Sequence, residues 1–434
     1  MTEPLKKPMG LKIYRAASRA AEPVANFALN RRLKAGKEDE TRIDERRGVA
    51  GRPRPDGRLI WIHGASVGES LSVLPLVKRL SVNRPDTFFL VTTGTVTSAK
   101  LMSERLPENA FHQYAPLDHP EFVRIFLEHW RPDAALFVES EFWPNLIIAA
   151  RDATPYMALI NGRVSPKSYA DWKSQPNAIK YLLSSFDLIL AQDHQNAERL
   201  TALADKQINT FGNLKHASAP LPVDENELTR LREALSERPS WLAASTHPGE
   251  EDIAIAVHKS LAAEFPGLVT FIAPRHPDRG ADIAEAAAAQ GLRVARRSET
   301  QALTGETDIY IADTLGELGI FYRLTDIAFI GGSINPKGGH NPLEPARLGG
   351  AVLHGPQTFN FADTYRDLRK AGGAALVRND QELSHAVRRL LNDQRTRRAM
   401  VDAARNAAET NAERVLNDIC DAITSRMPET TVPS

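Results

Sequence analysis

The chain has 434 residues, of which 42% are hydrophobic and 25% are charged, and its 54 lysines and arginines balance 54 aspartates and glutamates. This length exceeds what one hydrophobic core usually supports, so we expect two domains. The neutral charge balance argues against a nucleic-acid-binding protein, whose domains usually carry a basic excess. The single cysteine, Cys420, excludes an intrachain disulfide and a cysteine-based metal site, which fits a reducing compartment.

The N-terminal residues 1–34 are locally basic, with eight lysines and arginines against only Glu3 and Glu22. No stretch reaches the about 20 apolar residues that a membrane span needs, and the segment lacks the pattern of a secretory signal. Short apolar faces at helical spacing, around 11–14 and 24–28, favour a segment that lies on an anionic membrane surface. A solvated leader is the alternative that composition leaves open.

A repeating rhythm begins at Leu59, in which a short apolar run ends in a turn rich in Gly, Ser, Thr or Pro and an amphipathic stretch follows. Such runs predict parallel strands that are buried on both faces and joined by helices. A polar, proline-punctuated stretch at 219–227 indicates a linker, after which the rhythm restarts. The expected strands are 59–63, 88–92, 134–138, 156–160 and 187–191 before the linker, and 241–245, 268–273, 308–312, 327–332 and 351–355 after it.

Two such units predict an α/β protein with two Rossmann-like, doubly wound domains that face an interdomain cleft. In open α/β sheets the ligand binds beyond the carboxyl ends of the strands, so the turns that follow the strands are expected to line this cleft. The predicted boundaries are 1–55 for the basic segment, 56–218 for the first domain, 219–238 for the linker, and 239–434 for the second domain with its C-terminal helices.

The turn after the first strand reads H-G-A-S-V-G-E-S, in which Gly64 and Gly68 permit a sharp bend. Glu69 falls in the first turn of the following helix, where a negative charge suits the helix dipole without any catalytic role. Because small residues precede it, we expect Glu69 to reach outward from a narrow loop as a general base.

The strand at 134–138 is followed by E-S-E-F-W-P-N, which places Glu139 and Glu141 on one side if the strand continues. The alternative for one of them is a buried ion pair with an arginine, and the split of roles between the two stays open. Further positions expected to line the cleft in the first domain are Gly68, Thr93, Gly94, Asn161, Arg163 and Lys215.

Two turns of the second domain, A-S-T-H-P-G-E-E and A-P-R-H-P, place small and basic groups after strands. The planar guanidinium of Arg275 suits a phosphate or a carboxylate. His247 and His276 either bind a ligand or cap their turns. No carboxylate recurs near them at the spacing of metal ligands, so no metal site is expected.

The strongest pattern is I-G-G-S-I-N-P-K-G-G-H-N-P-L-E-P-A, at 330–346. Gly338 and Gly339 are expected to open a helix whose exposed N–H groups attract a phosphate, with Asn341 in its first turn and Glu344 placed to bind ribose hydroxyls. Glycines that serve only tight packing are the alternative. The sequence contains no P-loop motif, and it contains no D-x-D pair for a metal-bound diphosphate.

In this order the motifs H-G-A-S-V-G-E-S, V-E-S-E-F-W-P-N, N-G-R-V-S, F-G-N-L-K, A-P-R-H-P and G-G-H-N-P-L-E-P-A resemble those of the 3-deoxy-D-manno-octulosonic acid (Kdo) transferases, over about residues 10–391. The resemblance implies a GT-B fold and inverting transfer of Kdo from CMP-Kdo to the lipid A precursor (lipid IVA) of lipopolysaccharide. It implies that Glu69 is the catalytic base. It assigns the CMP moiety to Arg275, His276, Pro277, Gly316, Glu317, Asn341 and Glu344, beside which we place Ser245, Thr246, Gly338 and Gly339.

The resemblance also implies work at the cytoplasmic face of a bacterial inner membrane, with peripheral or weak attachment through the basic segment. No cofactor or metal is expected, because CMP leaves as a monophosphate. Another GT-B enzyme, either a UDP-sugar transferase or a UDP-N-acetylglucosamine 2-epimerase, shares the glycine-rich turn and the ribose-binding glutamate. A non-catalytic nucleotide-binding module is the third alternative, and an outward Glu69 argues against it.

Overall fold

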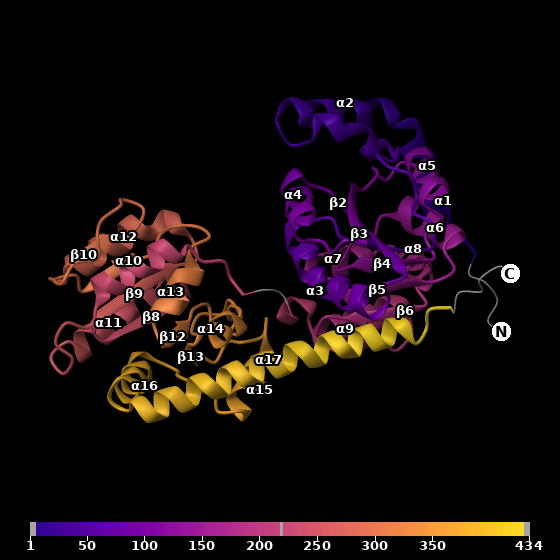
Figure 1. Cartoon of the computed structure of the whole chain (residues 1–434). Helices are drawn as coiled ribbons and strands as arrows, with labels where there is room; N and C mark the ends of the chain where they lie inside the picture. The colour runs from indigo at the N-terminus through magenta and orange to yellow at the C-terminus, as the bar shows by residue number, and fades with distance from the viewer. Residues whose placement is uncertain (1–5, 218–219, 429–434) are drawn as a thin grey trace. The chain divides into compact units, whose positions relative to one another are not determined.

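The computed structural model describes residues 6–217 and 220–428 and divides into two compact units (Figure 1). Unit 1 comprises Met1–Ser218 with Ala412–Ser434, and unit 2 comprises Ala219–Asn411. In each unit a seven-stranded sheet, parallel at every strand pair, lies between two layers of helices. The α/β class with two Rossmann-like domains is therefore confirmed.

Unit 1 begins with three helical segments and continues with alternating strands and helices. Its sheet has the order β3-β2-β1-β4-β5-β6-β7. The elements are α1 (Met9–Ala20), α2 (Glu22–Lys34), η1 (Glu40–Arg47), β1 (Arg58–His63), α3 (Val67–Asn83), β2 (Thr87–Thr93), α4 (Val96–Arg105), β3 (Ala110–Tyr114), α5 (Pro120–Trp130), β4 (Ala134–Val138), α6 (Pro144–Ala153), β5 (Met157–Gly162), α7 (Pro166–Lys173), α8 (Pro176–Ser184), β6 (Leu188–Ala191), α9 (His194–Ala204), β7 (Asn209–Thr210) and η2 (Leu214–Ala217).

Unit 2 repeats this architecture, and its sheet has the order β10-β11-β9-β8-β12-β13-β14. The elements are α10 (Glu225–Leu235), β8 (Ser240–Thr246), α11 (Glu250–Leu261), β9 (Val269–Pro274), η3 (Pro277–Arg279), α12 (Gly280–Ala288), β10 (Val294–Arg296), β11 (Ile309–Ile311), α13 (Leu318–Leu324), β12 (Ile327–Ile330), α14 (Leu343–Leu348), β13 (Ala351–His354), α15 (Ala362–Lys370), β14 (Ala374–Leu376) and α16 (Asp380–Asn392). The last helix, α17 (Gln394–Thr424), contributes to both units.

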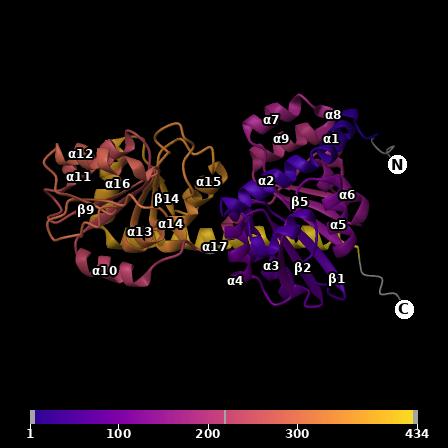
Figure 2. The ribbon, with the colours of Figure 1, turned by 90° about the horizontal axis from the view of Figure 1, so that it is seen from above.

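Both faces of each central strand are buried, as the continuous apolar runs predict. All six residues of β1 are buried, and its four apolar residues divide between two cores. One core of unit 1 lies between the sheet and α5, α6, α8 and α9, and the other lies between the sheet and α3, α4 and the end of α17. Helix α1 packs against α5 and α6, and Figure 2 shows it on the flank of unit 1 away from α3.

The units differ from the predicted domain boundaries in two places. Residues 412–424 of α17 join unit 1, because Val415, Ile419 and Ile423 are buried against its sheet. Within the expected linker 219–238, residues 225–235 form the amphipathic helix α10, whose leucines enter the core of unit 2. Across residues 6–217 and 220–428, no helix combines the length and apolar character that crossing a membrane requires.

Candidate functional site

The predicted site residues of unit 1 gather at one edge of its sheet. Glu69 follows β1, Gly94 follows β2, Glu139 follows β4, and Asn161 is the second-to-last residue of β5. Since β2, β1, β4 and β5 are consecutive neighbours, their carboxyl ends bring these positions together.

Glu69 is folded back onto its own loop. Ser66 caps α3, its Oγ accepts a hydrogen bond from Glu69 N at 3.2 Å, and the Glu69 carboxylate accepts from Ser66 Oγ at 2.9 Å and Ala65 N at 2.7 Å. This reciprocal arrangement resembles a capping box. Glu69 is only 8% exposed, so the expectation that it reaches outward is wrong.

The protonation of Glu69 is set by opposing effects. Burial raises the pKa of its carboxyl, and the nearby charge of Glu139 raises it further, whereas hydrogen bonds from Ser66 and Ala65 lower it. The net effect is a raised pKa, so Glu69 loses its proton at a higher pH than a free glutamate and is a stronger base once ionised.

Glu139 and Glu141 have different environments. Glu139 is 4% exposed, and its carboxylate lies 2.6 Å from Lys215 Nζ and 3.9 Å from Arg163 Nη1. Glu139 is thus the glutamate that forms a buried ion pair, and its nearer partner is a lysine and not the expected arginine. Burial, with the charges of Glu69 and Glu139, raises the pKa of Glu141 to about 7. Glu141 therefore holds or releases a proton near neutral pH.

Strained backbone fixes two of these turns. Glu139 and Asn161 both have positive φ, at 58° and 53°, in the left-handed region that few non-glycine residues adopt. The Asn161 side chain accepts a hydrogen bond from Leu214 N at 3.0 Å, which ties the end of β5 to the turn that carries Lys215. Gly68, by contrast, has open space where a Cβ would lie, so no close approach requires glycine there.

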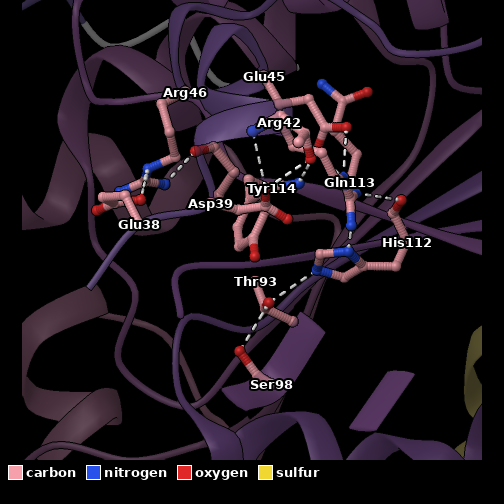
Figure 3. A network of polar contacts seen from close by, with 12 residues as sticks. Glu38, Asp39, Arg42, Glu45, Arg46, Thr93, Ser98, His112, Gln113 and Tyr114 are labelled. Atoms are coloured by element: carbon pink, nitrogen blue, oxygen red, sulfur yellow. Dashed lines mark hydrogen bonds and ion pairs between the residues drawn. The ribbon is translucent and has the colours of Figure 1, made fainter. Parts of the chain in front are cut away.

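The end of β2 is held by a polar network that the sequence did not reveal (Figure 3). Arg42 of η1 donates to Glu45 through two hydrogen bonds of 2.8 Å, and its Nη2 lies 3.1 Å from His112 Nδ1. An arginine only donates, so Nδ1 accepts and the opposite ring nitrogen donates to Thr93 Oγ1, at 2.8 Å. Burial, then the charge of Arg42, lowers the pKa of His112 to about 3, which keeps the ring neutral.

This network reaches the loop of Glu69 through one backbone contact. Gly94, directly after Thr93, donates from its N–H to Ala65 O at 3.1 Å. A Cβ at Gly94 would lie 3.1 Å from the same oxygen, so the close approach favours glycine. The segment 40–47 thus supports the turn after β2 that contacts the loop of Glu69. The feature of the sequence that pointed to this segment was the density of charged residues just before the first strand.

The predicted donor-site residues of unit 2 lie at the carboxyl ends of β11, β9, β8 and β12, which are consecutive strands of its sheet. Arg275 and His276 are exposed after β9, and Thr246 is buried at the end of β8 beside the strained Ser245, with φ 55°. Pro277 starts η3. The structure therefore brings these turns to one edge.

A buried carboxylate holds the glycine-rich loop. Glu250 is 0% exposed and accepts hydrogen bonds from the N–H groups of four residues within 3.1 Å. They are His247 (3.0 Å), Gly332 (2.7 Å), Ser333 (3.1 Å) and Ile334 (3.0 Å). Successive backbone N–H groups of this kind form an anion-binding concavity, and here the carboxylate of Glu250 already fills it.

Gly338 and Gly339 do not open a helix, which corrects the expectation from the sequence. Helix α14 begins at Leu343 and has six residues. Both glycines have positive φ, and a Cβ at Gly338 would lie 2.5 Å from the Phe359 ring. Backbone conformation and tight packing therefore account for glycine here, which was the alternative interpretation.

Asn341 and Glu344 interact with each other after this loop. Asn341 Nδ2 donates to Glu344 Oε1 at 3.3 Å, and Asn341 Oδ1 accepts from Leu343 N at 3.1 Å. Burial raises the pKa of Glu344, and hydrogen bonding to Asn341 and the charge of Arg275 oppose the shift. The positive charge of Arg275 therefore favours the ionised form of the Glu344 carboxyl.

Glu317 is engaged by an arginine that sequence reasoning missed. Arg297 binds its carboxylate in a bidentate manner, with Nε–Oε2 at 3.0 Å and Nη2–Oε1 at 2.6 Å, and this lowers the pKa of Glu317. Gly316 beside it is exposed, with φ 84°. The described residues contain no group of three or more His, Cys, Asp or Glu side chains placed to hold a metal ion.

Two seven-stranded parallel sheets with polar turns at their carboxyl ends define the class, a glycosyltransferase fold of the GT-B type. A glycosyltransferase from Rickettsia africae ESF-5 has this fold, with a TM-score of 0.58 at 14% identity over 86% of this chain and 100% of that chain. A family model described as 3-deoxy-D-manno-octulosonic-acid transferase (kdotransferase) matches residues 41–218.

Curated relatives identify the family. The 3-deoxy-D-manno-octulosonic acid transferase of Rickettsia bellii is 34% identical over 96% of this chain and 100% of its own length. That of Haemophilus influenzae is 34% identical over 83% of this chain and 86% of its own. The chain belongs to the 3-deoxy-D-manno-octulosonic acid transferases and is a glycosyltransferase.

Proposed function

We propose that the protein transfers Kdo from CMP-Kdo to the lipid A precursor, lipid IVA, with inversion at the anomeric carbon. The observation that carries this proposal is family membership over nearly the whole chain. The sites agree with it: unit 1 contains a cluster of carboxyl groups suited to proton abstraction, and unit 2 contains Arg275 and His276, exposed after β9 and suited to a phosphate.

In this reaction Glu69 is the proposed catalytic base. It takes the proton of the acceptor hydroxyl as that oxygen attacks the anomeric carbon and CMP departs. General-base catalysis contributes roughly 10²–10⁴-fold. The raised pKa of Glu69 makes it a better proton acceptor than an ordinary glutamate above that pKa. Its contacts with Ala65 N and Ser66 Oγ use one lone pair on each carboxylate oxygen, which leaves a second on each oxygen for the acceptor hydroxyl.

The phosphate is proposed to bind beside Arg275, whose exposed guanidinium offers a fork of donors without any metal ion. The buried Glu344 carboxyl is proposed to accept from the ribose hydroxyls. Ser245, Thr246, Gly316 and Glu317 are proposed to complete the donor site from the neighbouring turns. This electrostatic contribution at the leaving group is often the largest single contribution to catalysis.

The acceptor is proposed to reach unit 1 from an anionic membrane surface, the cytoplasmic face of a bacterial inner membrane. Helices α1 and α2 expose large apolar side chains alongside their basic residues. These side chains and their exposed fractions are Met9 67%, Ile13 61%, Val24 67% and Phe27 71%. Such a combination binds the interface of a membrane without spanning it.

The test is incubation of the purified protein with CMP-Kdo and tetraacyl lipid IVA, followed by mass spectrometry of the lipid. The expected result is a mass increase of one or more Kdo residues that a Glu69→Gln variant does not produce. Parallel reactions with UDP-sugars test the other GT-B activity. Transfer or epimerisation with a UDP-sugar and none with CMP-Kdo would contradict the proposal.

A further inference from the structure

Two histidines of unit 2 meet edge to edge, with nearly parallel ring planes. His247, in the turn after β8, and His340, in the glycine-rich loop, have ring centroids 5.2 Å apart and an angle of 8° between their planes. Their Nε2 atoms are 3.0 Å apart. At hydrogen-bond distance one of these nitrogens must carry a proton and the other must accept it, so the two imidazoles share a proton between them.

The pair is held rigidly by the surrounding fold. His247 is 9% exposed, and its backbone N–H donates to the buried Glu250 at 3.0 Å. The backbone oxygen of His340 accepts from the Tyr365 hydroxyl at 2.7 Å. His276 contacts His247 edge to face, with centroids 5.9 Å apart. The pair thus lies directly beside the turn that carries Arg275.

The groups around the pair disfavour a second proton when no ligand is bound. Burial lowers the pKa of both rings, that of His340 to about 4. Arg275, His276 and Lys337 add repulsion, which the negative charge of Glu250 opposes at His247. An anion beside Arg275 would cancel much of this positive charge and raise the pKa of the pair.

We propose that the His247–His340 pair takes up one proton from solvent when the phosphate of a nucleoside monophosphate binds beside Arg275, so that nucleotide binding is linked to pH. This inference rests on the proposed CMP donor. As the bond from the anomeric carbon to the phosphate oxygen breaks, its electron pair stays on that oxygen and the phosphate gains one negative charge. The added proton on the pair offsets this charge and donates a hydrogen bond toward the leaving group.

The test is calorimetric titration of the full-length protein with CMP at pH 7.5, in several buffers that differ in ionisation enthalpy. The dependence of the observed enthalpy on that of the buffer gives the number of protons taken up. At this pH a phosphate monoester is already mostly dianionic, because its second pKa is about 6. We expect about one proton in the wild type and close to none in His247→Asn and His340→Asn. His385→Asn, which removes an exposed histidine of α16, should behave as wild type.

A second measurement needs no variant. The Kd of the wild-type protein for CMP should rise with pH and approach a tenfold increase per pH unit between about pH 7.5 and 9, as linkage to one proton requires. Cytidine, which lacks the phosphate, should bind without proton uptake.

The outcomes separate this inference from the proposed function. Failure of the wild-type protein to bind CMP would overturn the proposed donor together with this inference. Binding of CMP without proton uptake would overturn the inference alone. Full proton uptake in both histidine variants would also overturn it, since another group would then be responsible.

Discussion

Glu250→Gln tests whether the buried carboxylate organises the glycine-rich loop. The carboxylate accepts four backbone hydrogen bonds within 3.1 Å, two on each oxygen. An amide keeps one oxygen but points two N–H donors at the other pair of N–H groups. Each lost hydrogen bond to a charged acceptor costs roughly 1.5–3 kcal/mol, and relaxation of the loop recovers part of the cost, so we expect the loop to lose about 3 kcal/mol of local stability.

The assay is hydrogen exchange of the full-length protein, followed by mass spectrometry of peptides that contain 331–337. A loss of about 3 kcal/mol corresponds to a roughly hundredfold drop in protection if these amides exchange by local opening. Asp252→Asn is the matched control, because it removes an exposed carboxylate from the same first turn of α11. Equal protection of the loop in the two variants would refute the role given to Glu250.

Five further predictions concern activity and membrane binding. Glu69→Gln should reduce transfer at least ~100-fold while CMP still binds, and retention of a tenth of the rate would contradict its role as base. Glu69 acts as a base only when it is ionised, so activity falls as the pH drops through its raised pKa. Glu139→Gln removes a negative charge that raises the pKa of Glu69, and it should therefore move the acidic limb of the pH–rate profile to lower pH; an unmoved limb would contradict this. Glu344→Ala should raise the donor KM roughly 10–100-fold, and an unchanged KM would limit Glu344 to a structural role. Activity should persist in excess EDTA, and complete loss that a metal restores would overturn the metal-free mechanism. Deletion of residues 1–34 should reduce salt-sensitive sedimentation with anionic vesicles, whereas resistance of the intact protein to both salt and alkali would indicate integral anchoring.

The ten strands expected from the sequence are all present, and the four that it missed are the edge strands of the two sheets. An interior parallel strand is covered by helices on both faces and needs a continuous apolar run. An edge strand does not need such a run. Strand β3, which carries His112 and Gln113, is an example. Helix α10 was missed for a related reason, because its polar first turn obscured the spacing of Leu228, Leu231 and Leu235.

The chain position of the site residues was predictable, but most of their side-chain contacts were not. Strand order brings the turns to one edge, and this follows from the alternation of strands and helices. The contact of Glu69 with its own loop had a signal in the sequence, because Ser66 and Glu69 have the S-x-x-E spacing of a capping box. That Glu317 pairs with Arg297 and that Glu250 fills the glycine-rich loop depends on distances between residues that the sequence does not give. Glu250 stands in the A-S-T-H-P-G-E-E turn and Arg297 in no recognisable motif, and only the fold reveals what each of them binds.

The discontinuity of unit 1 has a consequence for its biosynthesis. Residues 412–424 cover one face of its sheet, and a Cβ at Gly212 would lie only 2.6 Å from the Val415 side chain, so the fit is close (Figure 1). During synthesis the chain emerges from its N-terminus, and all of unit 2 is made before this last helical segment appears. The apolar face that Val415, Ile419 and Ile423 cover is therefore open while the ribosome translates the intervening residues. A nascent chain that stalls or ends within them carries an exposed core, which makes it a natural substrate for chaperones and proteases.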